Sequence, residues 1–171
     1  MRAIILAAGN SSRLLNNSEN MPKGLLDING KSIIQRQIIL FREKKIDDII
    51  IVTGPNSDEF DFKDVTYVKD QNYTEHEVLG SLMETKNLMN TEMIMTYSDI
   101  LFDKTILEQI LNFQDDIGIA TETNWLPAYK NRSQHTISQA DNVLIKNGKI
   151  IEIRKNMAKY LKNEKLGEFF G

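Results

Sequence analysis

Short apolar runs alternate with amphipathic segments through the first two thirds of the chain, and this alternation constrains the fold most strongly. A continuous apolar or β-branched run indicates a strand that is buried on both faces. Such strands, when they alternate with helices, predict an α/β fold in which helices flank a mostly parallel sheet. The predicted strands are residues 3–8, 48–53, 65–68, 93–97 and 117–121, and the predicted helices are residues 32–45, 77–89 and 105–113.

The predicted helices carry recognisable capping residues and apolar stripes. Ser32 is a typical N-cap for the first helix, and Asp103 is one for the third. The spacing of apolar residues indicates which side of the first two helices faces the core. The stripes are Ile34, Ile38 and Phe41 in the first helix, and Leu79, Leu82 and Met83 in the second.

The last third of the chain has a different pattern. Apolar runs on either side of Asn147-Gly148 predict a hairpin with a two-residue turn. A lysine-rich stretch from 155 to 165 is typical of a solvated surface, and Phe169-Phe170 reads as the start of one more strand. The length of 171 residues fits a single domain, 1–171.

Composition excludes several classes of function. The chain has no cysteine, which removes disulfide scaffolds, cysteine-ligated zinc, iron–sulfur clusters and thiol nucleophiles. A net charge of −3 argues against a large nucleic-acid surface. No apolar stretch reaches the length needed to cross a bilayer. We therefore expect a cytoplasmic protein with neither a nucleic-acid nor a membrane partner.

The first predicted strand runs into a turn of small residues that is followed by two cations. Small residues let backbone N–H groups approach phosphate oxygens, while an arginine fork and a lysine point charge bind phosphate. The glycine spacing matches neither the Walker A loop nor the dinucleotide fingerprint. On the residues alone, an ordinary strand-to-loop turn remains an alternative. The segment consists of Leu6, Ala7, Ala8, Gly9, Asn10, Ser11, Ser12 and Arg13, followed by Pro22 and Lys23.

Residues 6–13 and 22–26 together resemble the signature of the nucleotidyltransferase superfamily, Leu-Ala-Ala-Gly-x-Gly-x-Arg followed by Pro-Lys-x-Leu. Ser11 replaces the usual second glycine. The resemblance implies a three-layer α/β/α Rossmann-like fold. It also implies a Mg²⁺-dependent enzyme that transfers a nucleotidyl group, CMP from CTP, to a small phosphorylated or phosphonate acceptor and releases pyrophosphate.

The resemblance assigns roles to individual residues. Residues 6–13 would hold the nucleotide, with Arg13 at the β- and γ-phosphates. Lys23 would stabilise charge on the α-phosphate, and Asp99, after a predicted strand, would bind Mg²⁺. Ser81 matches a serine near the base, whereas Glu77 replaces an asparagine typical of the cytidylyltransferase branch.

The segment from 124 to 155 resembles phosphocholine and phosphonate cytidylyltransferases. In that branch, Trp125, Tyr129, Arg132 and Lys155 would bind the acceptor. Trp125 and Tyr129 lie four residues apart, so they share a side of a helix if the segment is helical. Plain core packing of these two aromatic residues is an equal alternative.

Members of this family usually continue for several more strands and helices and supply a second metal-binding carboxylate. The chain is therefore expected to lack the usual C-terminal portion of the family. A sugar-1-phosphate nucleotidyltransferase and a truncated, non-catalytic nucleotide-binding remnant remain alternatives, and a homo-oligomer is left open.

Overall fold

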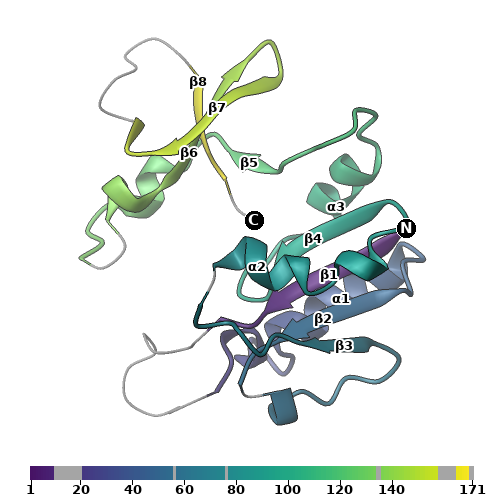
Figure 1. Cartoon of the computed structure of the whole chain (residues 1–171). Coiled ribbons are helices and arrows are strands. Elements are labelled where there is room, and N and C mark those ends of the chain that lie inside the picture. The colour runs from purple at the N-terminus through teal and green to yellow at the C-terminus, as the bar shows by residue number, and fades with distance from the viewer. Residues whose placement is uncertain (10–20, 56, 76, 134–135, 158–164, 170–171) are drawn as a thin grey trace. The chain divides into compact units, whose positions relative to one another are not determined.

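The computed structural model describes residues 1–9, 21–55, 57–75, 77–133, 136–157 and 165–169, the last of these by backbone alone. The chain divides into two compact units, Met1–Leu107 and Glu108–Gly171, each with its own sheet (Figure 1). That the two form a single domain stays a prediction.

The first unit is built on a four-stranded parallel sheet. Its strands are β1 (Arg2–Ala7), β2 (Ile49–Thr53), β3 (Thr66–Lys69) and β4 (Met93–Tyr97), in the order β3-β2-β1-β4. Every neighbouring pair is parallel, and β1 pairs with both β2 and β4. All residues of β2 are buried, as its continuous β-branched run predicts. The parallel sheet expected from the sequence is therefore confirmed.

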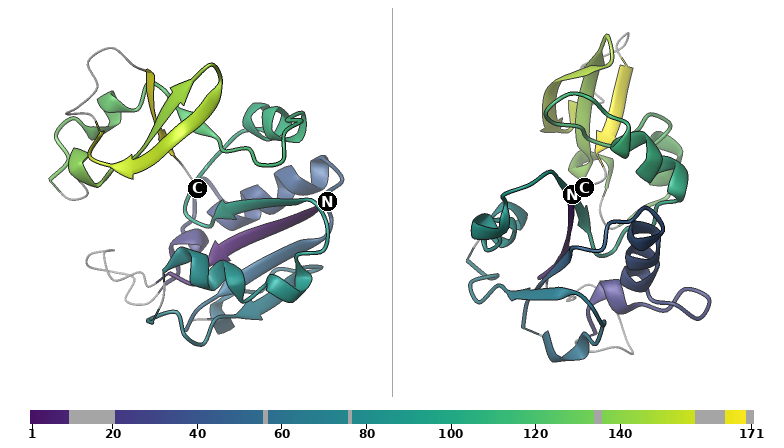
Figure 2. Two further views of the ribbon diagram at one scale, coloured as in Figure 1. Left: turned by 45° about the horizontal axis from the view of Figure 1, so that its top comes forward. Right: turned by 90° about the vertical axis from the view of Figure 1, so that its right-hand side faces the viewer.

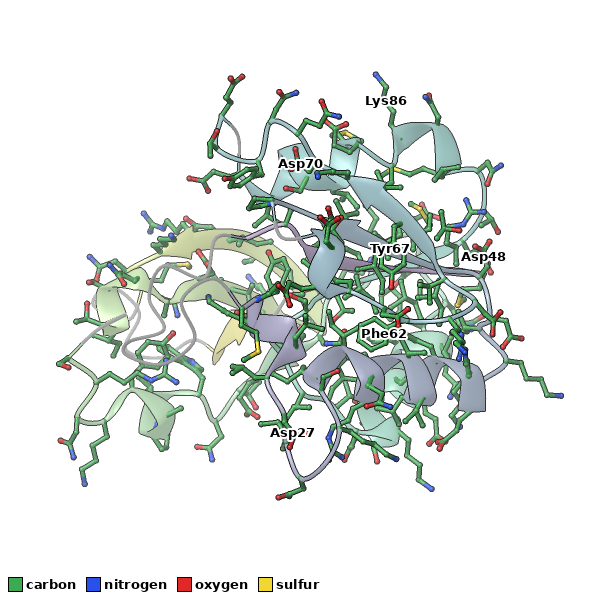
Figure 3. The ribbon with its side chains drawn as sticks, turned by 90° about the horizontal axis from the view of Figure 1, so that it is seen from below. Asp27, Asp48, Phe62, Tyr67, Asp70 and Lys86 are labelled. Atoms are coloured by element: carbon green, nitrogen blue, oxygen red, sulfur yellow. The ribbon has the colours of Figure 1, made fainter. Side chains whose placement is uncertain are left out.

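Helix α1 (Ile33–Glu43) covers one face of this sheet. The Ser32 hydroxyl accepts the N–H of Gln35 at 3.2 Å, which confirms the predicted N-cap. The predicted stripe of Ile34, Ile38 and Phe41 is buried. Helix α2 (Val78–Met83) lies over the opposite face, so the unit has three layers (Figure 2). The layers are also visible in Figure 3, where Asp70 lies on the α2 side and Asp27 on the α1 side.

Helix α2 differs from its prediction in both length and rotation. It ends at Met83, with a separate 3-10 turn at Lys86–Leu88, and Leu79 is 68% exposed. Met83 is also exposed, so of the predicted stripe only Leu82 packs against the core. The inward side instead carries Ser81, and Thr85 just after the helix end is also buried. The Thr85 hydroxyl donates to the Leu82 carbonyl, whereas the Ser81 hydroxyl donates to Asp70 and so fixes the rotation of the helix, which apolar spacing alone does not reveal.

Helix α3 (Lys104–Leu111) crosses the boundary between the units. The carboxylate of Asp103 accepts the N–H groups of Thr105 and Ile106 at 2.9 and 3.1 Å. Asp103 therefore caps the helix, as the sequence predicts. The helix ends two residues before the predicted boundary.

The second unit contains an antiparallel sheet. Its strands are β5 (Thr121–Glu122), β6 (Asp141–Lys146), β7 (Lys149–Lys155) and β8 (Lys165–Phe169), in the order β5-β8-β6-β7. The β6–β7 hairpin is confirmed, and Asn147 and Gly148 adopt the positive φ angles that a type I′ turn requires, 52° and 76°. The predicted strand at 117–121 is wrong apart from its last residue, because Ile117 is 82% exposed. Strand β8 begins earlier than Phe169 and pairs with both β5 and β6.

Among the described residues, no helix combines the length and the apolar character needed to cross a bilayer.

Candidate active site

Lys23 and Asp99 lie together at the carboxyl ends of the parallel strands. Lys23 Nζ is 3.3 Å from Asp99 Oδ2. Asp99 directly follows β4, and Lys23 begins the 3-10 turn Lys23–Leu25 in the segment that follows β1. The two side chains are 35% and 41% exposed, so both remain accessible to a ligand. In parallel sheets, this edge is where ligands bind.

Gly24 allows the turn that carries Lys23 to pack closely. A Cβ at this position would lie 2.6 Å from Ile34 Cδ1 and 2.8 Å from Ser98 Cβ. Only glycine fits without displacing α1 or the turn after β4. This close packing holds Lys23 beside the turn that bears Asp99.

The turn that carries Asp99 is held from two sides. The Ser98 N–H donates to the Leu6 carbonyl at 3.0 Å, which extends the β1–β4 pairing by one residue. On α1, the Gln37 amide nitrogen donates to the carbonyls of Tyr97 and Ile100 at 2.9 and 2.8 Å. Asp99 thus lies between two backbone groups that α1 fixes.

The predicted nucleotide-binding segment begins in the core and reaches the surface at Gly9. Leu6, Ala7 and Ala8 are buried, whereas Gly9 is exposed. A Cβ on Gly54 would lie 2.5 Å from the Ala8 carbonyl oxygen, so the ends of β1 and β2 approach backbone to backbone. The predicted binding residues Asn10, Ser11, Ser12 and Arg13 lie outside the described residues.

Ser81 belongs to a buried polar cluster on the α2 side of the sheet. Its hydroxyl donates to Asp70 Oδ2 at 2.7 Å, and Asp70 Oδ1 accepts the N–H of Asn72 at 3.0 Å. The Asp70 N–H in turn donates to the Thr53 carbonyl at 2.8 Å. Asp70 therefore ties the loop after β3 to α2 and to the end of β2. The predicted role of Ser81 in nucleotide binding stays a prediction.

The residues present fit a magnesium ion bound through one carboxylate. Mg²⁺ in phosphate-binding sites commonly takes one or two carboxylates and completes its coordination with substrate phosphates and water. Asp99 supplies an accessible carboxylate beside the Lys23 ammonium group. The described residues contain no group of three or more His, Asp or Glu side chains that would form an all-protein metal cage.

Comparison with known proteins agrees with this geometry. Residues 3–147 match the family model of the MobA-like NTP transferase domain. The chain belongs to this family.

Curated relatives of the chain include cytidylyltransferases. The chain is 25% identical over 176 residues to a CTP:phosphoglutamine cytidylyltransferase of Campylobacter jejuni, across 94% of this chain and 68% of that protein. It is 36% identical over 106 residues to a choline-phosphate cytidylyltransferase of Streptococcus pneumoniae, across 60% of this chain and 46% of that protein. It thus spans about half to two thirds of these relatives' lengths.

Solved structures share the fold. A CTP:phosphocholine cytidylyltransferase from Streptococcus pneumoniae superposes with a TM-score of 0.68 at 25% identity. The match covers 99% of this chain and 67% of that one. An inositol-1-phosphate CTP transferase from T. maritima has a TM-score of 0.70 at 17% identity, across 98% of this chain and 67% of that one. The nucleotidyltransferase fold expected from the sequence is therefore confirmed.

In this family member, the predicted acceptor residues all lie in the second unit. Trp125 and Tyr129 are buried, at 2% and 8% exposure, with their rings edge-to-face at a centroid distance of 5.5 Å. The Arg132 guanidinium lies 4.5 Å from the Tyr129 ring centroid, in a cation–π contact. Lys155 ends β7, with its Nζ 3.9 Å from Asp141 Oδ1, and is 63% exposed. The observed burial favours packing for the two aromatic residues, whereas Arg132 and Lys155 stay accessible.

Sequence reasoning missed four residues that build the site. The sequence pattern leaves Gln37, Gly24 and Gly54 without a predicted role in the site. Asp70 gave no local signal, because its partner Ser81 is 11 residues away. For Gln37, the clue in the sequence was a polar residue between Ile34, Ile38 and Phe41, on the side of the helix that faces the core.

Proposed function

We propose that the protein transfers CMP from CTP to a small phosphorylated or phosphonate acceptor, with Mg²⁺, and releases pyrophosphate. The observation that carries this proposal is the Lys23–Asp99 pair, a cation and a carboxylate 3.3 Å apart at the ligand-binding edge of the sheet. A relative and a solved structure whose names specify CTP and a phosphorylated acceptor support the choice of substrates.

In this mechanism, an oxygen of the acceptor's phosphate or phosphonate attacks the α-phosphorus of CTP in line. The bond from that phosphorus to the bridging oxygen breaks, and pyrophosphate leaves. Catalysis of this kind consists mainly of positioning and charge neutralisation. Lys23 neutralises charge that builds on the α-phosphate. Backbone N–H groups of residues 6–13 bind the triphosphate, and Arg13 holds its β- and γ-phosphates.

Magnesium, held by Asp99, would neutralise charge on the triphosphate oxygens. Asp99 lies close enough to Lys23 for the two side chains to reach the same phosphate group. A second carboxylate, which the family usually supplies, is not assigned to any residue of this chain.

Acceptor binding is assigned to the second unit. Arg132 and Lys155 are accessible cations, so they are suited to the anionic group of the acceptor. We assign Trp125 and Tyr129 a supporting role, because their buried rings hold the segment from which Arg132 projects.

A pyrophosphate-release assay tests the proposal. The protein would be given Mg²⁺, each of the four nucleoside triphosphates, and choline phosphate, 2-aminoethylphosphonate, phosphoglutamine or a sugar 1-phosphate. We expect turnover with CTP and one of the first three acceptors. Preference for a sugar 1-phosphate would replace the proposal by a sugar nucleotidyltransferase. CTP binding without turnover under any combination would identify a non-catalytic nucleotide-binding protein.

A further inference from the structure

One buried glutamine on α1 reaches across to the turn that carries Asp99. Gln37 is 1% exposed, and its amide nitrogen lies 2.9 Å from the Tyr97 carbonyl and 2.8 Å from the Ile100 carbonyl. Both partners accept hydrogen bonds and neither donates one. The amide therefore has to turn its NH₂ group toward them, and each of its two hydrogens has its own acceptor.

Packing alone does not account for a glutamine here. Its neighbours on the inward side of α1 are Ile34, Ile38 and Phe41, and an apolar side chain would satisfy the same position. The Gln37 Oε1 atom is buried and receives no hydrogen bond from the described residues. Because a buried polar atom without a partner costs free energy, a residue that carries one has a role other than filling space.

The place of Asp99 in the sheet explains what the glutamine does. Among the described residues, β4 pairs with β1 alone, so the turn after β4 has a described neighbouring strand on one side. On that side, Ser98 bonds to Leu6. Gln37 fixes the same turn through the carbonyls before and after Ser98-Asp99. The two sets of bonds leave the backbone at Asp99 little freedom to rotate.

We infer that Gln37 is a positioning residue for the reaction, which holds the 97–100 turn so that the Asp99 carboxylate is presented beside Lys23. This inference rests on the proposed function, because it assigns Gln37 to the proposed metal ligand. Groups that orient a metal ligand contribute to metal affinity without touching the metal.

The test compares two variants with a matched control. Gln37→Met keeps the length and volume of the side chain and removes both donors. Gln37→Asn keeps the amide but is one methylene too short to reach both carbonyls, and it carries the test if the first variant does not fold. Gln35→Met makes the same chemical change two residues away, at an exposed position of the same helix.

The first measurement is amide hydrogen exchange at residues 98–100, which does not depend on turnover. The second is Mn²⁺ binding, by electron paramagnetic resonance, in the presence of α,β-methylene-CTP. We expect faster exchange and about tenfold weaker metal binding in Gln37→Met, the usual size of such effects. In the turnover assay, we expect the half-saturating Mg²⁺ concentration to rise by a similar factor, while kcat at saturating Mg²⁺ changes much less.

Exchange or metal binding within twofold of the Gln35→Met control would overturn the inference. Faster exchange with unchanged metal binding would also overturn it, because Gln37 would then serve the fold alone. A wild-type protein that binds Mn²⁺ with the analogue but shows no turnover would contradict the proposed function. Hydrogen exchange and Mn²⁺ binding would then decide by themselves whether Gln37 positions the metal ligand.

Discussion

Lys23 and Asp99, the proposed phosphate-binding cation and the proposed metal ligand, form one partly exposed ion pair. Pairs with this degree of exposure contribute under about 1 kcal/mol to stability, because solvent screens them and their side chains lose entropy. Their proximity is therefore better explained by what they bind than by what they stabilise. Substitutions at either position should therefore lower the activity of the protein while its stability stays nearly the same.

Replacement of Lys23 tests this expectation most directly. We expect Lys23→Ala to lower the rate of pyrophosphate release by about 10²- to 10³-fold, the usual loss when one group that stabilises a developing charge is removed. The melting temperature should change little, because the lysine is partly exposed. Lys86→Ala is the matched control, an exposed lysine on the α2 side of the sheet (Figure 3). Near-normal turnover of Lys23→Ala would refute the assignment.

Asp99 can be tested with an isosteric change. We expect Asp99→Asn to raise the Mg²⁺ concentration needed for half-maximal rate by at least about tenfold, because the neutral amide is a poor ligand for a hard cation. Asp103→Asn makes the same change four residues away. It should leave both Mg²⁺ dependence and stability unaltered, since asparagine caps a helix as well as aspartate does. Equal metal dependence in the two variants would remove Asp99 from the metal site.

At Gly54, the end of β2 lies against the end of β1, so a change there affects the packing of the two strands. Gly54→Ala places a Cβ 2.5 Å from the Ala8 carbonyl, so one strand end has to move. We expect a loss of about 1–3 kcal/mol in the free energy of unfolding, as for other overpacked positions, measured by urea denaturation. Gly9→Ala is the comparison, since nothing lies within 4 Å of the added Cβ. Equal stability of the two variants would show that the strand ends are not rigid.

The strands and α1 were predictable because their signals are local and strong. β1, β2 and β4 are continuous apolar runs, and Ser32 gives α1 an unambiguous start. The rotation of α2 was not predictable, because a hydrogen bond from Ser81 to Asp70 decides it. Strand β8 was missed in part because the strand begins in a lysine-rich segment, and its pairing with β5 and β6 is non-local.

The candidate site was predictable only where side chains carry the chemistry. Lys23 and Asp99 were identified from a family resemblance, and the structure brings them together. Gln37, Gly24 and Gly54 act by shape and by hydrogen bonds to backbone atoms, which depend on elements far apart in the chain. Apart from the polar position of Gln37 on the apolar side of α1, no local sequence pattern distinguishes such residues from ordinary helix and turn positions.

The division of the chain into two units separates the two groups of candidate binding residues. The described residues that are predicted to bind the nucleotide or its metal ion lie in Met1–Leu107 and include Lys23, Ser81 and Asp99, whereas Arg132 and Lys155 lie in Glu108–Gly171. Each unit has its own sheet, and a bound ligand slows amide exchange mainly in the elements that it contacts. The two substrates should therefore leave different signatures in hydrogen exchange.

We expect α,β-methylene-CTP with Mg²⁺ to slow exchange at the ends of β1 and β4 and in α2. Choline phosphate, or the acceptor preferred in the turnover assay, should slow exchange in residues 125–133 and in β7 when added to that complex. In the double variant Arg132→Ala, Lys155→Ala, the protection by the acceptor should disappear while the protection by the CTP analogue persists, because both cations lie outside Met1–Leu107. Protection by the CTP analogue that is confined to residues 121–157 would contradict this assignment, since the nucleotide would then bind in the second unit.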